Sequence, residues 1–228
     1  MSALNTALVV VGAITIAYFA ILNGLYLAFT AIAWRSLGRH LRGRAYSAAE
    51  EAFDSPFTPG ITVILPAFNE AAGIVESVHS LLALRYPRYE VLVVNDGSTD
   101  ETVARLEHAF DLVPAHRAVR SSIVTRPIGS SYVSRRNPNL WVLDKANGGK
   151  ADALNAGVAA AQHPYVCALD ADALIETDAL LRVAEPILDD PERVIATGGI
   201  VRIANGSTID HGRVTGCGCR GTRWPCFR

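Results

Sequence analysis

The chain has 228 residues and a formal net charge of -1, and 50% of its residues are hydrophobic. This length can form one α/β domain of ordinary size with residues to spare. The charge gives no reason to expect a nucleic-acid partner, because proteins that bind phosphate backbones carry a clustered excess of basic side chains.

The first segment, residues 1–34, has the composition of a transmembrane helix. It contains no Asp, Glu, Lys or Arg, and its apolar run exceeds the roughly 20 residues that a helix needs to cross a bilayer. A cleaved signal peptide is the alternative, but such peptides start with basic residues and have a shorter apolar core. We therefore expect a retained membrane helix.

Residues 35–60, which follow the predicted helix, have the composition of a basic flank and a linker. The basic residues nearest the helix are Arg35, Arg39, Arg42 and Arg44, and none precedes the helix. Positive charge is enriched on the cytoplasmic side of membrane helices. We expect a single pass through the cell (inner or plasma) membrane, with the N-terminus outside and the residues after Trp34 in the cytoplasm.

From Ile61 onward, short apolar runs alternate with amphipathic stretches. The predicted strands are residues 61–66, 89–96, 121–126, 140–145, 165–170 and 194–205. The predicted helices are residues 70–84, 99–110, 150–162 and 177–188, with a polar loop over 127–138. Nearly continuous apolar strands separated by helices predict a mainly parallel sheet with helices on both faces.

Polar motifs follow the predicted strands, where ligands bind in sheets of this kind. They are Pro66–Glu70, Asn95–Ser98, Asn147–Lys150 and Asp170–Asp172. "NDGSTD" is also a common turn and helix cap. "NGGK" suits a phosphate at a helix start but lacks the spacing of a P-loop. No G-x-G-x-x-G follows the first strand, which disfavours a Rossmann dinucleotide fold.

The pair Asp170 and Asp172 indicates a metal site, because two carboxylates at the end of a buried strand need a cation or hydrogen bonds. Their spacing suits Mg²⁺ or Mn²⁺ bridging two phosphate oxygens, with Lys150 as a second cation. This combination would neutralise the charge of a departing nucleoside diphosphate. A phosphatase with an Asp nucleophile is the alternative from another class, but its D-x-D motif belongs on the first strand of the domain.

These stretches together resemble the family 2 glycosyltransferases, in particular the membrane-bound synthases of β-linked polysaccharides. The matching stretches are "VILPAFNE", "YEVLVVNDGSTDET", "NGGKADALNAG", "ALDADALIETDAL" and "ATGGIVRIANG", in family order. The resemblance implies a partial GT-A domain over residues 61–215. It also implies inverting transfer of a sugar, expected to be N-acetylglucosamine, from a UDP-sugar to a growing polysaccharide.

The resemblance also implies roles for individual residues. Around the nucleoside it places Pro66, Ala67, Asn69 and Glu70, with Asp96 reading uracil or ribose. Near the diphosphate and sugar it places Lys150 and Asp170, and on the metal it places Asp172, with Asp170 beside it. The implied partners are the UDP-sugar, a polysaccharide or lipid-linked acceptor, and the membrane, with Mg²⁺ or Mn²⁺ as the cofactor.

The chain departs from the family pattern after residue 215. The family's catalytic base Asp and its Q-x-x-R-W motif are missing, so the catalytic residue is unknown. Residues 216–228 form an aberrant tail that holds Cys217, Cys219 and Cys226, which lack zinc-site spacing. A shifted reading frame near Thr215 would explain this tail. A polyprenyl-phosphate glycosyltransferase and a catalytically dead membrane-anchored fragment remain alternatives.

Overall fold

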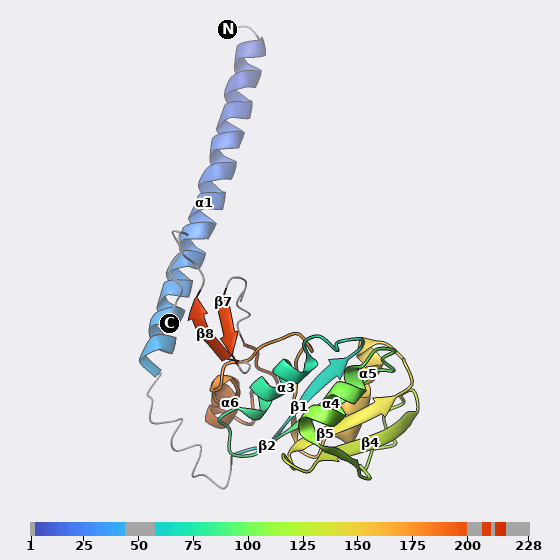
Figure 1. Ribbon diagram of the computed structural model, residues 1–228. Helices are drawn as coiled ribbons and strands as arrows, with labels where there is room; N and C mark the ends of the chain where they lie inside the picture. The colour runs from blue at the N-terminus through green and yellow to red at the C-terminus, as the bar shows by residue number, and fades with distance from the viewer. Residues whose placement is uncertain (1–2, 44–57, 200–206, 211–212, 218–228) are drawn as a thin grey trace. The chain divides into compact units, whose positions relative to one another are not determined.

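The computed structural model describes residues 3–43, 58–199, 207–210 and 213–217 (Figure 1). The chain divides into two compact units, Met1–Glu50 and Glu51–Arg228.

The first unit consists of helix α1 (Ala3–Gly43), which continues past the predicted end at Trp34. Its segment Ala7–Arg35 has a mean hydropathy of 2.2 and is long and apolar enough to cross a membrane. Its polar side chains Thr15, Asn23 and Thr30 donate to backbone carbonyls four residues earlier. This internal pairing satisfies groups that would be costly to leave unpaired in lipid.

The second unit contains a six-stranded sheet in the order β3-β4-β5-β2-β1-β6. Its strands are β1 (Ile61–Ala67), β2 (Tyr89–Asn95), β3 (Leu112–Pro114), β4 (Ile128–Ser134), β5 (Leu140–Lys145) and β6 (Tyr165–Ala168). The strands β5, β2, β1 and β6 are parallel, whereas β3 and β4 run antiparallel to their neighbours. The prediction of a mainly parallel sheet is therefore confirmed.

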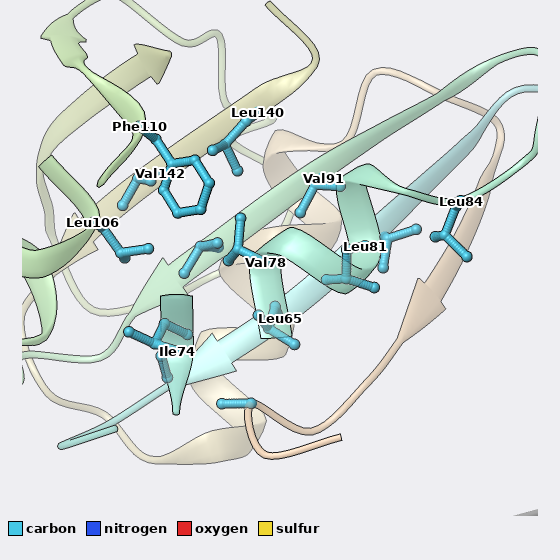
Figure 2. Packing of buried hydrophobic residues seen from close by; sticks show 14 of the residues in the cluster. Leu65, Ile74, Val78, Leu81, Leu84, Val91, Leu106, Phe110, Leu140 and Val142 are labelled. Atoms are coloured by element: carbon cyan, nitrogen blue, oxygen red, sulfur yellow. The ribbon is translucent and has the colours of Figure 1, made fainter. Parts of the chain in front are cut away.

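Helices cover both faces of this sheet because successive strand residues point to opposite sides. Val63 and Leu65 of β1 belong to a cluster with residues of α3 (Ile74–Leu82), α4 (Thr102–Phe110) and α6 (Ala179–Asp189). Figure 2 shows the part of this cluster around Val78 and Phe110. Ile64 lies in a second cluster with α5 (Lys150–Ala160).

Helix α5 packs very close to the sheet. A Cβ atom added at Gly157 would lie 2.4 Å from Cγ2 of Ile64. The buried alanines Ala153, Ala156 and Ala160 complete the same small-residue face. Small side chains allow this approach, and they explain why an alanine-rich helix lies here.

Two predicted strands differ in the structure. Residues 121–126 form no strand, and the predicted polar loop contains β4, which pairs antiparallel with β5. Val124 is 89% exposed, and the apolar part of its run is too short to cover a sheet face. Most of β4 is only half-buried, and a strand of this kind accepts polar residues such as Ser130 and Ser131.

The predicted strand at 194–205 is also absent over its described part. Residues 194–199 have no regular structure, and the rest lies outside the described residues. Gly198 and Gly199 provide no side chains for a sheet face, which weakens a strand. After this segment, β7 (Ser207–Asp210) and β8 (Arg213–Cys217) form an antiparallel pair. Gly216 and Cys217 of the predicted tail belong to β8, and residues 218–228 lie outside the described residues.

A buried ion pair lies near the amino-terminal ends of the strands. One carboxylate oxygen of Glu90 accepts hydrogen bonds from Arg117 at 2.7 Å, from Thr62 at 2.6 Å and from the Gln162 N–H at 3.0 Å. The Arg117 guanidinium also lies 4.8 Å from the centre of the Trp141 ring. Burial disfavours the charged form of Glu90, but the hydrogen bonds from Thr62 and Arg117 outweigh it and lower the pKa of this carboxyl.

Candidate functional site

The polar motifs meet at the carboxyl-terminal edge of the parallel strands. In the register of the sheet, Ala67 at the end of β1 pairs with Asn95 at the end of β2, and Asn95 pairs with Asp144 of β5. Strand β6 pairs with β1 on its other side. The loops that follow these strands are thereby placed along one edge of the sheet.

The loop after β1 is tied to the loop after β2. The Asn69 N–H donates to Ser98 Oγ at 2.9 Å, and Asn69 Oδ1 accepts from the Thr99 N–H at 2.8 Å. The Glu70 N–H donates to Thr102 Oγ1 at 3.0 Å. Asn69 has φ 57, a left-handed conformation that Asn tolerates better than most residues. Both side-chain and backbone groups of this predicted nucleoside loop therefore hold it in one shape.

Pro66 and Ala67 are buried at the end of β1, whereas Asn69 is exposed and Glu70 is half-buried. The Ala67 carbonyl accepts from the Asp96 N–H at 2.9 Å. Of this predicted nucleoside group, the structure therefore leaves the side chains of Asn69 and Glu70 accessible, and it uses Ala67 to position Asp96.

Asp100 supports the same two loops. Its carboxylate accepts from the Ala71 N–H at 3.1 Å and from the Thr102 N–H at 3.0 Å, and it binds the Thr102 hydroxyl. The hydrogen bond from the Thr102 side chain lowers the pKa of Asp100 most strongly. Asp100 thus accepts from the first N–H group of α4 and also holds the loop after β1.

Asp96 lies at the centre of the site and is only 3% exposed. Its Oδ1 accepts from Lys145 Nζ at 2.5 Å and from the Gly148 N–H at 3.0 Å. Its Oδ2 accepts from the Gly149 N–H at 2.7 Å, and its backbone carbonyl accepts from Asn147 Nδ2 at 2.8 Å. The "NGGK" loop is therefore folded around Asp96. The side chain of Asp96 is therefore more buried than we expected for a residue that contacts a ligand.

Lys145 connects this network to α5, although no sequence motif predicted a role for it. Its ammonium lies 2.6 Å from Oδ2 of Asp152 as well as 2.5 Å from Asp96. Burial disfavours its charge, but the hydrogen bonds and charges of Asp152 and Asp96 outweigh burial and raise its pKa. One feature of the sequence could have indicated this role: Lys145 is a charged residue at the end of the apolar stretch "LWVLDK".

Glycines allow the two central loops to approach each other. Gly97 has φ +67, and a Cβ there would lie 2.8 Å from the Asn147 backbone nitrogen. A Cβ at Gly148 would lie 2.5 Å from Asp152 Oδ2, and Gly149 has φ +87. A side chain at any of these positions would require strain or displacement. The glycines in "NDGS" and "NGGK" therefore serve the packing of one loop on the other.

The predicted diphosphate and metal residues lie beside this network with exposed side chains. Lys150 Nζ lies 2.5 Å from Asp170 Oδ1, and these side chains are 63% and 61% exposed. Asp172 is also exposed. The structure thus brings Lys150 to Asp170, from the start of α5 and the end of β6.

The residues present fit a divalent cation that takes most of its ligands from elsewhere. Among the described residues, no group of three or more His, Cys, Asp or Glu side chains could hold a metal ion. Mg²⁺ characteristically binds through one or two carboxylates together with substrate phosphates and water. Asp170 and Asp172 supply two carboxylates of this kind, and Asp170 already attracts the Lys150 ammonium.

Solved structures are similar to part of this chain. The crystal structure of Staphylococcus aureus TarS 1-349 with UDP-GlcNAc is 26% identical, with a TM-score of 0.43, covering 57% of this chain and 31% of that one. The mannosyltransferase PcManGT from Pyrobaculum calidifontis, in complex with GDP-Man and Mn²⁺, is 25% identical with a TM-score of 0.45. It covers 64% of this chain and 39% of that one.

Sequence relatives and a family model also match this chain. The poly-beta-1,6-N-acetyl-D-glucosamine synthase of Staphylococcus aureus (strain COL) is 31% identical over 166 residues, 69% of this chain and 34% of the relative. The synthase of the same name from Staphylococcus epidermidis is 30% identical over the same shares. This chain thus spans 34% of the length of these relatives. The model of Glycosyl transferase family 2 matches residues 62–224, so the chain belongs to this family.

Proposed function

We propose that this chain provides the donor-binding part of a membrane-anchored, inverting glycosyltransferase that builds a polysaccharide from UDP-N-acetylglucosamine. The observation that carries the proposal is the gathering of Asp96, Lys150 and Asp170 beside one edge of the sheet in a family 2 domain. The similarity to poly-beta-1,6-N-acetyl-D-glucosamine synthases supports the choice of sugar and polymer.

In this proposal, the loops after β1 and β2 bind the nucleoside. Pro66, Ala67, Asn69 and Glu70 would surround the nucleoside. An ionised carboxylate only accepts hydrogen bonds, so Asp96 can accept the N3–H of uracil. Among the described residues, Asp96 Oδ2 accepts only from Gly149, and a carboxylate oxygen can accept a further hydrogen bond.

The diphosphate and its metal ion would be bound by Lys150, Asp170 and Asp172. The two carboxylates would hold Mg²⁺ or Mn²⁺, which supplies positive charge against the diphosphate as it leaves. Lys150 would exchange its contact with Asp170 for one with the diphosphate. The exposure of both side chains leaves them free to separate, because a surface ion pair contributes at most about 1 kcal/mol.

Helix α1 would anchor this domain in the cell membrane, with the N-terminus outside and the domain in the cytoplasm. Its apolar length supports the anchor, and the arginines that follow Trp34 support the orientation. Inverting transfer also needs a base to deprotonate the acceptor hydroxyl. We assign that role to no side chain in the described part of the chain.

Titration of the purified full chain in detergent with nucleotides tests the proposal. We expect UDP and UDP-N-acetylglucosamine to bind more tightly in Mn²⁺ than in EDTA, and GDP to bind more weakly than UDP. Equal affinities for UDP and GDP, or no UDP binding, would contradict it. Incubation with labelled donor and a polyprenyl phosphate distinguishes the lipid-acceptor alternative, because that activity would give a labelled lipid on thin-layer chromatography.

A further inference from the structure

We infer that Lys145 is a positioning residue for recognition of the nucleoside, because its buried ammonium holds Asp96 in place as an acceptor. This inference rests on the proposed function, in which Asp96 accepts a hydrogen bond from the donor base. Lys145 itself would touch neither the donor nor the acceptor.

The Lys145 ammonium is buried, and its hydrogen-bond partners all belong to the protein. Lys145 is the last residue of β5, and its side chain is 0% exposed. Nζ contacts Asp96 Oδ1 at 2.5 Å, Asp152 Oδ2 at 2.6 Å and the Ala146 carbonyl at 2.6 Å. An ammonium has three N–H donors, so these partners use all of them. The ammonium is therefore committed to the protein and is not available to bind a ligand.

A second observation is the shape of the loop around Asp96. Lys145, Gly148 and Gly149 all donate to the same carboxylate. Lys150, the predicted diphosphate residue, follows Gly149 directly as the first residue of α5. Loss of the ammonium would remove the charged member of this set and leave only two backbone N–H groups on Asp96. The position of the Lys150 backbone therefore depends on a charge five residues earlier.

A third observation is the balance of charge. Asp96 and Asp152 both lie within 2.6 Å of one ammonium. Without that ammonium, two carboxylates would face each other, one of them almost inaccessible to water. Like charges repel each other strongly where water is excluded. This repulsion would displace the Asp96 carboxylate from the position in which it can accept the uracil N3–H.

A purely structural role for Lys145 is the competing explanation, and the chain offers a matched control for it. Arg117 and Glu90 also form a buried ion pair, with side chains 0% and 6% exposed, compared with 0% and 4% for Lys145 and Asp96. That pair lies near the amino-terminal ends of the strands, away from the predicted donor residues. Breaking it should destabilise the domain without touching nucleoside recognition.

The test compares Lys145→Met, Lys145→Gln and Arg117→Met in the full chain in detergent, with UDP and GDP each titrated by calorimetry. Lys145→Met should weaken UDP binding roughly tenfold or more, the loss typical of a hydrogen bond to a charged group. Its preference for UDP over GDP should also decrease, because a displaced Asp96 no longer reads the base. Arg117→Met should keep wild-type affinity despite a lower Tm.

Two further variants separate charge from packing. Lys145→Gln keeps a hydrogen-bond donor without the charge, so it should fold where Lys145→Met does not and still lose part of the preference for UDP over GDP. Adding Asp96→Asn to either Lys145 variant removes the residue through which Lys145 acts. Compared with Asp96→Asn alone, the Lys145 substitution should then cause no further loss of UDP affinity.

Each outcome bears on one of the two claims. If the wild-type chain binds UDP and Asp96→Asn weakens it, but both Lys145 variants keep wild-type affinity and preference for UDP over GDP, this inference is wrong and the proposed function stands. The inference is also wrong if Arg117→Met loses the same UDP affinity and the same preference. If the wild-type chain binds no UDP, the proposed function fails and the inference fails with it.

Discussion

The two ends of the parallel strands both contain a buried ion pair, yet their surroundings differ. At the amino-terminal ends, Glu90 and Arg117 are closed in by Thr62, Gln162 and the Trp141 ring. At the carboxyl-terminal ends, Asp96 and Lys145 adjoin glycine loops, and beside them lies an exposed pair of opposite charges, Lys150 and Asp170. A buried charge by itself therefore does not indicate a binding site. We base the proposed donor site on the accessible charges beside Asp96 and Lys145.

The largest expected effect breaks the amino-terminal pair. Arg117→Ala would leave Glu90 buried without its cation and remove the contact with Trp141. Removing one partner of a buried pair costs about 3–5 kcal/mol of folding free energy. Urea unfolding measures this loss. UDP affinity of the remaining folded protein should be unchanged, and a parallel loss of affinity would mean that the two ends of the sheet are coupled.

Asp96→Ala should act on both stability and binding at the other end. It removes the acceptor of Lys145, Gly148 and Gly149, and we expect UDP affinity to fall by about 1.5–3 kcal/mol, the range for hydrogen bonds to charged groups. Calorimetry in EDTA checks this without the metal. Equal losses for UDP and GDP would show that Asp96 does not read the base.

Asp172→Ala tests the exposed part of the same end. Its side chain is exposed, so folding free energy should change by no more than about 0.5 kcal/mol. UDP affinity in Mn²⁺ should fall to the value that the wild-type chain shows in EDTA. Retained enhancement of UDP binding by Mn²⁺ would count against the metal role of Asp172.

The smallest expected effect concerns acid stability at the amino-terminal ends. The folded pKa of Glu90 lies below its ordinary value of 4.5. Its contribution is therefore fully present above that value, and it is lost as the pH falls through the lower folded pKa. Glu90→Gln leaves the buried Arg117 without its counter-charge, so it lowers stability at every pH. It should also remove this small acid-dependent part, as measured by unfolding at a series of pH values. If the decrease in the free energy of unfolding at acidic pH is the same in this variant, other carboxyl groups dominate that decrease.

The sheet was largely predictable because its core strands carry a simple signal. The stretches "ITVILP" and "VLVVN" have no charged residues, and a strand covered on both faces buries such a run. By contrast, β4 reads "IGSSYVS" and was predicted as a loop. Half-buried strands carry weaker patterns, since one side of the strand faces water.

The location of the candidate site was predictable from the sequence, but the hydrogen bonds and ion pairs within it were not. Asp96, Lys150 and Asp170 were expected at strand ends, and the register of the sheet puts those ends along one edge. The burial of Asp96 and the part taken by Lys145 were not foreseen. Their hydrogen bond joins residues 49 positions apart along the chain, and no local pattern records such a pairing.

By itself, the sequence determined the apolar N-terminal helix, the mainly parallel sheet and the order of the polar motifs along the chain. These features follow from hydrophobic periodicity and from turn residues, which act over a few neighbouring positions. Only the tertiary structure decided which charges are buried and paired and which remain exposed. That division depends on the close approach of loops at Gly97 and Gly148, because an ion leaves water only where packing provides its partner.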